Sequence, residues 1–219
     1  MISFSGIDCS GKSTQIENVK NAFGKAHKKC KVIHSRGGYT PVLEFFKNLF
    51  RKDKKGTTEE QEQYRQEIHG NPKKRKMLLW LSILDMGLYY GIHFRFVELF
   101  GKTILADRYF WDSYIDFQMK YPEFDFEKWV VWRLARRISK KPSKSIIYTI
   151  PAELSMYRST LKDEPWPEPI DVRRTRIDHY MKEISNGRWD TVIDATGTVE
   201  EVFEATMNAI AVPKRRKNK

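Results

Sequence analysis

The chain has 219 residues, of which 40% are hydrophobic and 31% charged, a mixture that can bury a core and is not that of a disordered protein. Two cysteines, Cys9 and Cys30, are too few for a disulfide framework or a zinc site, so we expect reduced thiols. The net charge of +12 suggests anionic partners, although five positive charges lie in the last six residues and the alternative is that the basic runs are solvated surface and a frayed tail.

One domain followed by a short tail is the simplest organisation for this chain. Its length suits one well-buried core better than two, so we predict a single domain at 1–213 and a basic tail at 214–219. The most apolar run, near 77–84, is far shorter than the roughly 20 residues that cross a bilayer. We therefore expect a cytoplasmic protein that has no membrane partner.

The first half of the chain predicts strands that alternate with amphipathic helices. We expect strands at 2–5 and 31–35, and helices at 12–28 and 42–50. The polar stretch at 52–66 is expected to be an exposed insertion or a mobile segment. The run at 76–100 is apolar at helical spacing, and we expect its stripe to form core or a dimer seam: Met77, Leu81, Leu84, Leu88 and Ile92.

The second half continues the same alternation. A short aliphatic run at 103–106 predicts a buried parallel strand that presents Asp107 at its carboxyl end. We expect further strands at 145–150 and 191–194, and helices at 109–120, 126–140, 153–160 and 172–185. This order predicts an α/β fold with a doubly wound, five-stranded parallel sheet flanked by helices, whose ligands gather at the carboxyl ends of the strands.

A phosphate-binding motif follows the first strand. Residues 6–13 match G-x-x-x-x-G-K-[ST] in full, which chance gives in a chain of this length only about once in a hundred. In this motif backbone N–H groups wrap a polyphosphate, the lysine reaches its β- and γ-phosphates, and the hydroxyl binds Mg²⁺. We predict that Ser13 binds Mg²⁺ and that the following residues hold ATP: Gly6, Cys9, Ser10, Gly11, Lys12, Ser13 and Thr14.

A second candidate site follows the strand at 103–106. A carboxylate at this position suits a second ligand on the magnesium side, acting directly or through water, and we assign this role to Asp107. The next residue, Arg108, can clamp an acceptor phosphate through two parallel N–H bonds. The alternative is a surface turn with an internal ion pair.

Together these motifs resemble the thymidylate kinase family of nucleoside monophosphate kinases, which share a P-loop fold. The resemblance runs over most of the chain, through residues 3–15, the Asp107-Arg108-Tyr109 triplet, 151–158 and 192–195. It implies transfer of the γ-phosphoryl group of ATP, with Mg²⁺, onto a nucleoside monophosphate by a homodimer. It also implies a lid near 159–172.

The resemblance assigns further residues to these roles. Asp8 stands where the family has a loop carboxylate near the acceptor sugar, and Lys47 stands where it has an arginine on the acceptor phosphate. Arg36 lies in the loop that precedes Lys47 and is likewise expected to bind the acceptor. Catalytic roles fall on Lys12, Asp8, Arg108 and Arg158, and Ala195 belongs to the loop near the adenine.

The chain departs from the family pattern around the acceptor and in the lid. Asp112 and Asp116 are four residues apart on a predicted helix, so both carboxylates would face an acceptor bearing hydroxyl or amine groups, or else face solvent or pair with Arg95 or Arg133. Between residues 159 and 172 the basic residue is Lys162. One of three later arginines is therefore expected to enter the site, unless they form an exposed helical face: Arg173, Arg174 and Arg176.

Two other functions fit the same motifs. The first is a kinase of the same scaffold that acts on a different small molecule, such as a sugar or a biosynthetic intermediate. The second is a nucleotide-dependent protein that binds nucleic acid through its basic residues, including the cluster at 73–76. Aromatic residues are not interleaved with its charged runs, so nucleic acid is the least favoured partner.

Overall fold

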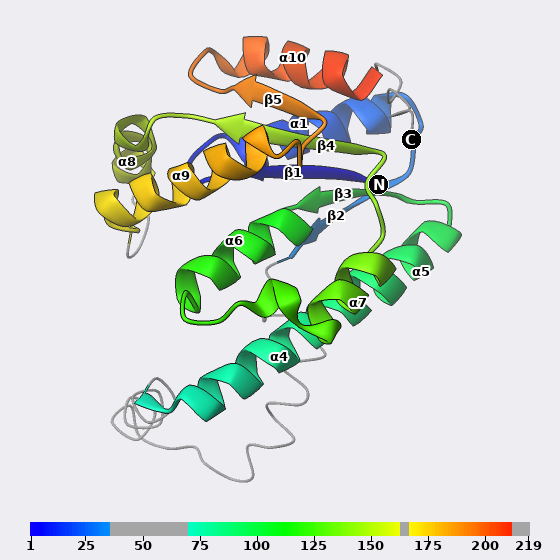
Figure 1. Cartoon of the computed structure of the whole chain (residues 1–219). Coiled ribbons are helices and arrows are strands. Elements are labelled where there is room, and N and C mark those ends of the chain that lie inside the picture. Colours follow the sequence, from blue (N-terminus) through cyan, green and yellow to red (C-terminus); the bar gives the residue numbers. More distant parts are fainter. Residues whose placement is uncertain (36–69, 163–166, 212–219) are drawn as a thin grey trace, which may run out of the picture. The chain divides into compact units, whose positions relative to one another are not determined.

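The computed structural model describes residues 1–35, 70–162 and 167–211 (Figure 1). Several predictions therefore lie outside the described residues: Arg36, Lys47, the helix at 42–50, the polar stretch at 52–66 and the tail at 214–219. Contacts between residues divide the chain into two compact units, one of Met1–Ser35, Phe96–Ile115 and Lys141–Lys219, and one of Arg36–Arg95 and Asp116–Lys140. The prediction of one domain at 1–213 stays a prediction.

The first unit contains a five-stranded sheet in which all strands are parallel, so this part of the predicted fold is confirmed. The strand order is β2-β3-β1-β4-β5. Their bounds are β1 Ile2–Gly6, β2 Cys30–His34, β3 Thr103–Asp107, β4 Lys144–Thr149 and β5 Thr191–Asp194. β1 is buried along its whole length because strands pair with it on both sides and helices cover both of its faces.

Helices α1 (Lys12–Lys25) and α10 (Val199–Ala211) pack against each other over one face of the sheet (Figure 1). Phe4 of β1 and Tyr148 of β4 point to this face and stack, with ring centroids 6.4 Å apart. The Tyr148 hydroxyl lies 2.9 Å from the Thr206 hydroxyl of α10. Burial raises the pKa of this phenol well above its ordinary value.

The opposite face is covered by α9 (Ile170–Ser185) and the start of α6 (Phe110–Lys120) (Figure 1). Ser5 of β1 donates a 2.6 Å hydrogen bond to Asp112 of α6, and Tyr180 of α9 donates another of 2.6 Å. Helix α8 (Ala152–Leu161) packs on α9. Helices on both faces of a parallel sheet are consistent with the doubly wound fold.

The second unit is helical in its described part. It holds α4 (Pro72–Leu88), the π-helical turn η1 (Tyr89–His93), the start of α5 (Phe94–Leu99), the short η2 (Phe126–Lys128) and α7 (Val130–Ile138). A Cβ atom added to Gly87 would lie 2.8 Å from that of Ala135, so the glycine allows α4 and α7 to approach closely. The helix predicted at 76–100 is interrupted by the wider π-helical turn η1. The helix predicted at 126–140 consists of the tighter 3-10 turn η2 followed by α7.

The apolar stripe predicted on α4 does not form the core. Met77, Leu88 and Ile92 are exposed and Leu81 and Leu84 are half-buried, whereas the fully buried side chains come from the opposite side of the helix: Leu79, Ile83, Met86 and Tyr90. The core alternative was wrong because opposite sides of this helix both carry an apolar stripe, and periodicity does not say which one faces inward. The seam alternative stays a prediction.

Among the described residues, one helical run, Pro72–Leu99, is long enough and apolar enough to cross a membrane, judged by length and composition alone. Half of its most apolar window is buried inside the protein. Core helices of soluble proteins pass the same test, so the expected cytoplasmic location stays a prediction.

Candidate functional site

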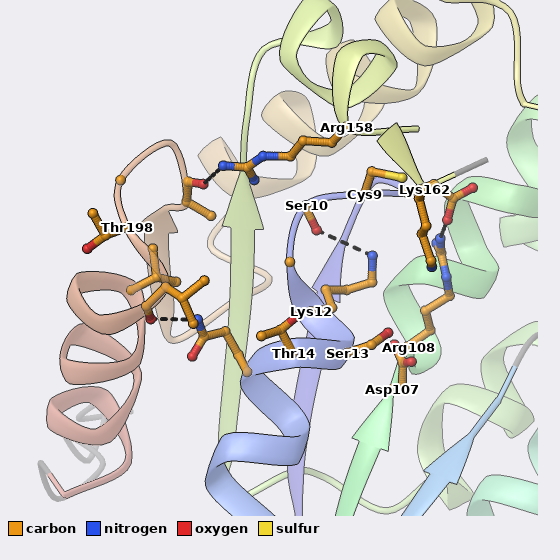
Figure 2. A pocket seen from close by; sticks show the side chains of 17 residues that line it. Cys9, Ser10, Lys12, Ser13, Thr14, Asp107, Arg108, Arg158, Lys162 and Thr198 are labelled. Atoms are coloured by element: carbon orange, nitrogen blue, oxygen red, sulfur yellow. Dashed lines mark hydrogen bonds and ion pairs between the residues drawn. The ribbon is translucent and has the colours of Figure 1, made fainter. Parts of the chain in front are cut away.

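A pocket of about 410 Å³ lies within the first unit, among the segments that follow β1, β3 and β5 (Figure 2). Residues 8–15 of the loop and of α1 form one wall of it. The other lining residues are Asp107, Arg108, Arg158, Lys162, Ala195, Gly197, Thr198, Val199 and Val202. The carboxyl ends of the strands therefore bring together most of the side chains predicted to bind ATP.

The loop after β1 has an unusual backbone that only certain residues can adopt. Gly6 has φ 137°, and a Cβ atom there would lie 2.5 Å from the Tyr148 carbonyl oxygen, so no larger residue fits. Cys9 and Gly11 have φ 57° and 85°, both in the left-handed region. Alternation of left- and right-handed residues makes a concave row of N–H groups, the form of backbone that binds anions.

Helix α1 begins directly after this loop. Its first hydrogen bond runs from the Gln15 N–H to the Gly11 carbonyl at 3.1 Å, and no side chain caps its N-terminus. The N–H groups of Lys12, Ser13 and Thr14 precede this bond, and the helix itself does not use them. Together with the helix dipole they make this end of the pocket attractive to an anion.

Lys12 is only 6% exposed, and its ammonium is folded back onto the loop. Its Nζ donates to the carbonyl oxygens of Gly6 at 2.8 Å and Ile7 at 2.6 Å, and lies 3.4 Å from the Ser10 hydroxyl. Burial, and secondly the nearby charge of Arg108, lower the pKa of Lys12 from 10.5 to about 8. An anion in the pocket would offset both effects.

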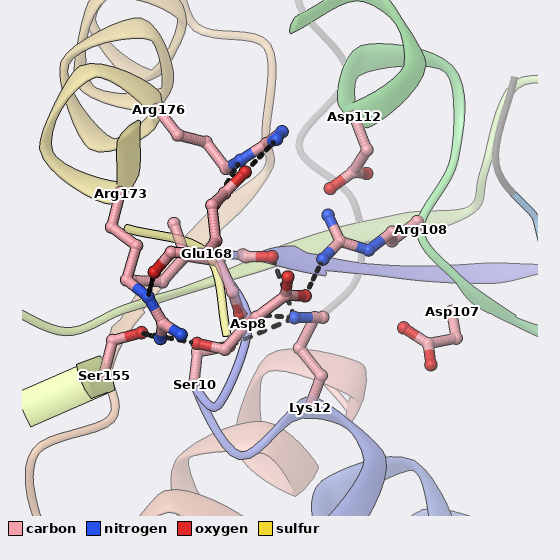
Figure 3. A network of polar contacts seen from close by, with 12 residues as sticks. Asp8, Ser10, Lys12, Asp107, Arg108, Asp112, Ser155, Glu168, Arg173 and Arg176 are labelled. Carbon is pink, nitrogen blue, oxygen red and sulfur yellow. Dashed lines mark hydrogen bonds and ion pairs between the residues drawn. The ribbon is translucent and has the colours of Figure 1, made fainter. Parts of the chain in front are cut away.

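Asp8, which follows β1, and Arg108, which follows β3, form an ion pair (Figure 3). Arg108 has φ 67°, an uncommon conformation for a residue with a side chain, and its N–H bonds to the Phe4 carbonyl at 2.9 Å. The Ser35 hydroxyl donates to the Arg108 carbonyl at 2.8 Å. Arg108 thus pairs with a residue outside the Asp107-Arg108 turn, and the pair lies in the pocket, which differs from the alternative of a surface turn with an internal ion pair.

Asp107 ends β3 and is 8% exposed. One carboxylate oxygen, Oδ2, lies 2.8 Å from Nδ1 of His34 at the end of β2. The other, Oδ1, is buried and has no hydrogen-bond partner among the residues that the structure describes. A buried carboxylate oxygen left open beside a candidate phosphate site fits a Mg²⁺ ion or its water.

A permanently bound metal ion needs more protein ligands than the one carboxylate of Asp107. No group of three or more His, Cys, Asp or Glu residues could hold a metal within 1–35, 70–162 and 167–211. Ser13 is exposed at the pocket, and with Asp107 it offers two oxygen ligands. Mg²⁺ that arrives with a nucleotide takes one or two protein ligands and phosphate oxygens for the rest, so this sparse set fits nucleotide-borne Mg²⁺ only.

Arg158 and Lys162 bring positive charge to the pocket from α8 and the residue after it. The Arg158 guanidinium donates to the Ala195 carbonyl at 3.1 Å (Figure 2), which ties the predicted lid arginine to the predicted adenine loop. Gln15 similarly donates to the Val199 carbonyl at 3.0 Å and ties α1 to α10. Lys162 therefore joins Arg158 as a charged lining residue.

The three arginines at the start of α9 do not form one exposed face. Arg173 is 1% exposed and bonds the Glu168 carbonyl, and Arg176 is buried and pairs with the Glu168 carboxylate at 2.8 Å (Figure 3). Arg174 is exposed and pairs with Glu153. The alternative of an exposed face was thus wrong for Arg173 and Arg176, since both are held by internal acceptors. None of the three lines the pocket, so the expectation that one of them enters the site stays a prediction.

Asp112 and Asp116 have different surroundings. Asp112 is 1% exposed and accepts from the Ser5 and Tyr180 hydroxyls and, at 2.9 Å, from the Tyr109 N–H. The last bond caps the start of α6, so Asp112 has its donors within the protein. Asp116 is half-buried, and neither aspartate lines the pocket. The geometry therefore gives no support to acceptor binding by Asp112.

Sequence reasoning missed several contributors to this site. Gln15, Gly197, Thr198 and Val199 line the pocket, and His34 bonds the predicted magnesium-side carboxylate. The sequence around 198–201 did carry a signal, a Thr-x-x-Glu capping box, which the structure forms at the start of α10 with a 2.8 Å bond from Thr198 N–H to Glu201. No protein-family model matches the chain, and a search of curated proteins found no match.

Proposed function

We propose that this protein is an ATP- and Mg²⁺-dependent P-loop kinase that phosphorylates a nucleoside monophosphate, in the manner of thymidylate kinases. One observation carries the proposal. A buried lysine ammonium, a left-handed loop and an uncapped helix N-terminus all border one pocket at the carboxyl ends of the strands. Few ligands other than a polyphosphate use all three features at once.

The positive groups of the pocket fit the needs of phosphoryl transfer. This reaction asks a protein mainly for alignment and for neutralisation of the charge spread over the transferring group. Lys12 would exchange its bonds to loop carbonyls for bonds to phosphate oxygens, while Arg158 and Lys162 add charge from the α8 side. Arg108, held by Asp8, would bind the acceptor phosphate.

Mg²⁺ would be held by the Ser13 hydroxyl and by Oδ1 of Asp107, directly or through water. When bound, it neutralises charge on the phosphate oxygens. His34 occupies the other carboxylate oxygen and so restricts rotation of Asp107. This chain's part would therefore be to hold the Asp107 carboxylate in one orientation, with Oδ1 left for the ion or its water.

The acceptor class is tested by coupled release of ADP across a panel. The panel contains thymidylate, the other nucleoside monophosphates, sugars and a blank, each with ATP and Mg²⁺. We expect turnover with at least one nucleoside monophosphate, because Arg108 presents a guanidinium suited to a phosphate rather than to a hydroxyl. Turnover confined to sugars would favour the other-acceptor kinase, and binding of RNA or DNA with no turnover at all would favour the nucleic-acid alternative.

Nucleotide binding should take up a proton in mildly alkaline solution. The pKa of Lys12 is lowered to about 8 in the ligand-free protein, and a bound polyphosphate would raise it back toward 10.5. Between these two values the free lysine is largely neutral and the bound one charged, so affinity for ADP should fall as pH rises above about 8, by up to tenfold per pH unit.

Titration calorimetry in buffers of different ionisation enthalpy measures this proton uptake directly. Lys12→Met should abolish it, whereas Lys20→Met, at an exposed site on α1, should leave it unchanged. Equal affinity and no proton exchange from pH 7 to 10 in the unaltered protein would show that the ligand does not meet Lys12.

We further propose a cytoplasmic homodimer. Met77, Trp80, Leu88 and Ile92 give α4 and η1 exposed apolar side chains, a feature that supports a seam between two copies. Light scattering that returned the mass of one chain at micromolar concentration would contradict the dimer.

A further inference from the structure

Arg173 is a buried cation with no evident part in the reaction proposed above. It is 1% exposed, and it is the largest side chain among those that are almost fully buried in the described chain. Among the described residues its hydrogen-bond partners are all neutral: the Glu168 carbonyl at 2.8 Å, the Ser159 hydroxyl at 3.0 Å and the Ser155 hydroxyl. Burying a guanidinium in this way is costly, which calls for a reason.

One of those partners leads directly to the phosphate loop. The Ser155 hydroxyl accepts from Arg173 and donates its own proton to the Asp8 carbonyl at 2.8 Å (Figure 3). Donation from a charged group polarises the hydroxyl and strengthens the bond that it gives. Ser159, one turn along α8 and as buried as Ser155, also accepts from Arg173, whereas Ser155 is the serine that the structure joins to the Asp8 carbonyl.

Fixing the Asp8 carbonyl fixes a peptide plane of the loop. A trans peptide directs its carbonyl and the next N–H to opposite sides, so the bond to Ser155 turns the Cys9 N–H away from α8. The plane lies between the Asp8 side chain, which pairs with Arg108, and Cys9, whose φ of 57° begins the left-handed part of the loop. A small rotation here would disturb both.

We infer that Arg173 is a positioning residue that holds the phosphate loop in its anion-binding shape through Ser155, and that it links this loop to the Glu168 segment at the start of α9. The second link follows from the bond between Arg173 and the Glu168 carbonyl, which Arg176 reinforces at the Glu168 carboxylate. The inference deepens the proposed function because it names what orders the site, but it does not depend on which acceptor is used.

The test compares Ser155→Ala with its matched control, Ser159→Ala. Both remove a buried hydroxyl that accepts from Arg173, so both should lower thermal stability to a similar extent. Ser155→Ala and Arg173→Lys should also weaken binding of Mg²⁺–ADP about tenfold, whereas Ser159→Ala should not. The double variant Ser155→Ala/Arg173→Lys should bind Mg²⁺–ADP no more weakly than the single variant with the lower affinity, because the two residues act through one bond.

Hydrogen exchange in the ligand-free protein supplies a reading that needs no nucleotide. Peptides covering residues 6–13 should exchange faster in Ser155→Ala and Arg173→Lys than in Ser159→Ala and the unaltered protein. Equal exchange in all four proteins, or equal effects of the two serine variants, would overturn the inference. If the unaltered protein binds nucleotide and phosphorylates nothing, the kinase proposal fails while this one stands.

Discussion

Replacing Lys12 by alanine should reduce turnover by about 10³-fold or more while the protein stays folded. The lysine is the group that meets the charge of the transferring phosphate in the proposed mechanism, and no neighbouring cation reaches the same loop carbonyls among the described contacts. Steady-state turnover at saturating ATP, set beside far-UV circular dichroism and thermal unfolding, measures both parts of this expectation.

The fold should survive because Lys12 stabilises the ligand-free protein little. Its lowered pKa means that the folded chain holds this charge less easily than the unfolded chain does. Lys20→Ala is the control, since Lys20 lies on the same helix, is exposed and pairs only with Glu17 in the described contacts. A Lys12→Ala protein with full turnover would remove the phosphate loop from the mechanism.

Replacing Gly6 by alanine should damage the fold itself. Its φ of 137° is strained for any residue with a side chain, and the added methyl group would lie 2.5 Å from a β4 carbonyl oxygen and 2.9 Å from the Ser10 hydroxyl. Strain and overpacking together should lower the free energy of unfolding by about 3 kcal/mol or more. Chemical denaturation of the two proteins measures the difference.

Gly11→Ala is the matched comparison for this prediction. Gly11 also has positive φ, 85°, but a Cβ atom there meets nothing within 4 Å. Its cost should be limited to the left-handed conformation, about 1–2 kcal/mol. If the two variants were equally stable, the close approach of the loop to β4 would not constrain the site.

The sheet and the loop were predictable because each has a strong local signal. A loosely alternating run that leads into a glycine predicted the strand at 2–5, and a short aliphatic run that ends at an aspartate predicted the strand at 103–106, each to within one residue of β1 and β3. The motif also singled out Lys12 and Ser13, which both line the pocket, although their binding of ATP and Mg²⁺ stays a prediction. Helix α10 was missed because its capping box at Thr198 was overlooked, although the sequence displayed it.

Other features depend on contacts that no local pattern carries. The burial of Arg173 and the donors around Asp112 come from side chains of several elements, so an arginine on a polar helix and an aspartate in an acidic pair suggested exposure or a ligand instead. The face of α4 that is buried was equally hard to predict, because the helix carries two apolar stripes. Tertiary packing decided these cases.

The candidate pocket is assembled from segments that are distant along the chain. Bonds across separations of 100, 147 and 184 residues join it together, from Asp8 to Arg108, from Asp8 to Ser155 and from Gln15 to Val199. Both strands that pair with β1, β3 and β4, come later in the chain and are therefore synthesised after it. Such contacts are slow to form, so the nascent chain should expose β1 unpaired until the residues of β3 have been synthesised, and should acquire its phosphate cradle only late in folding.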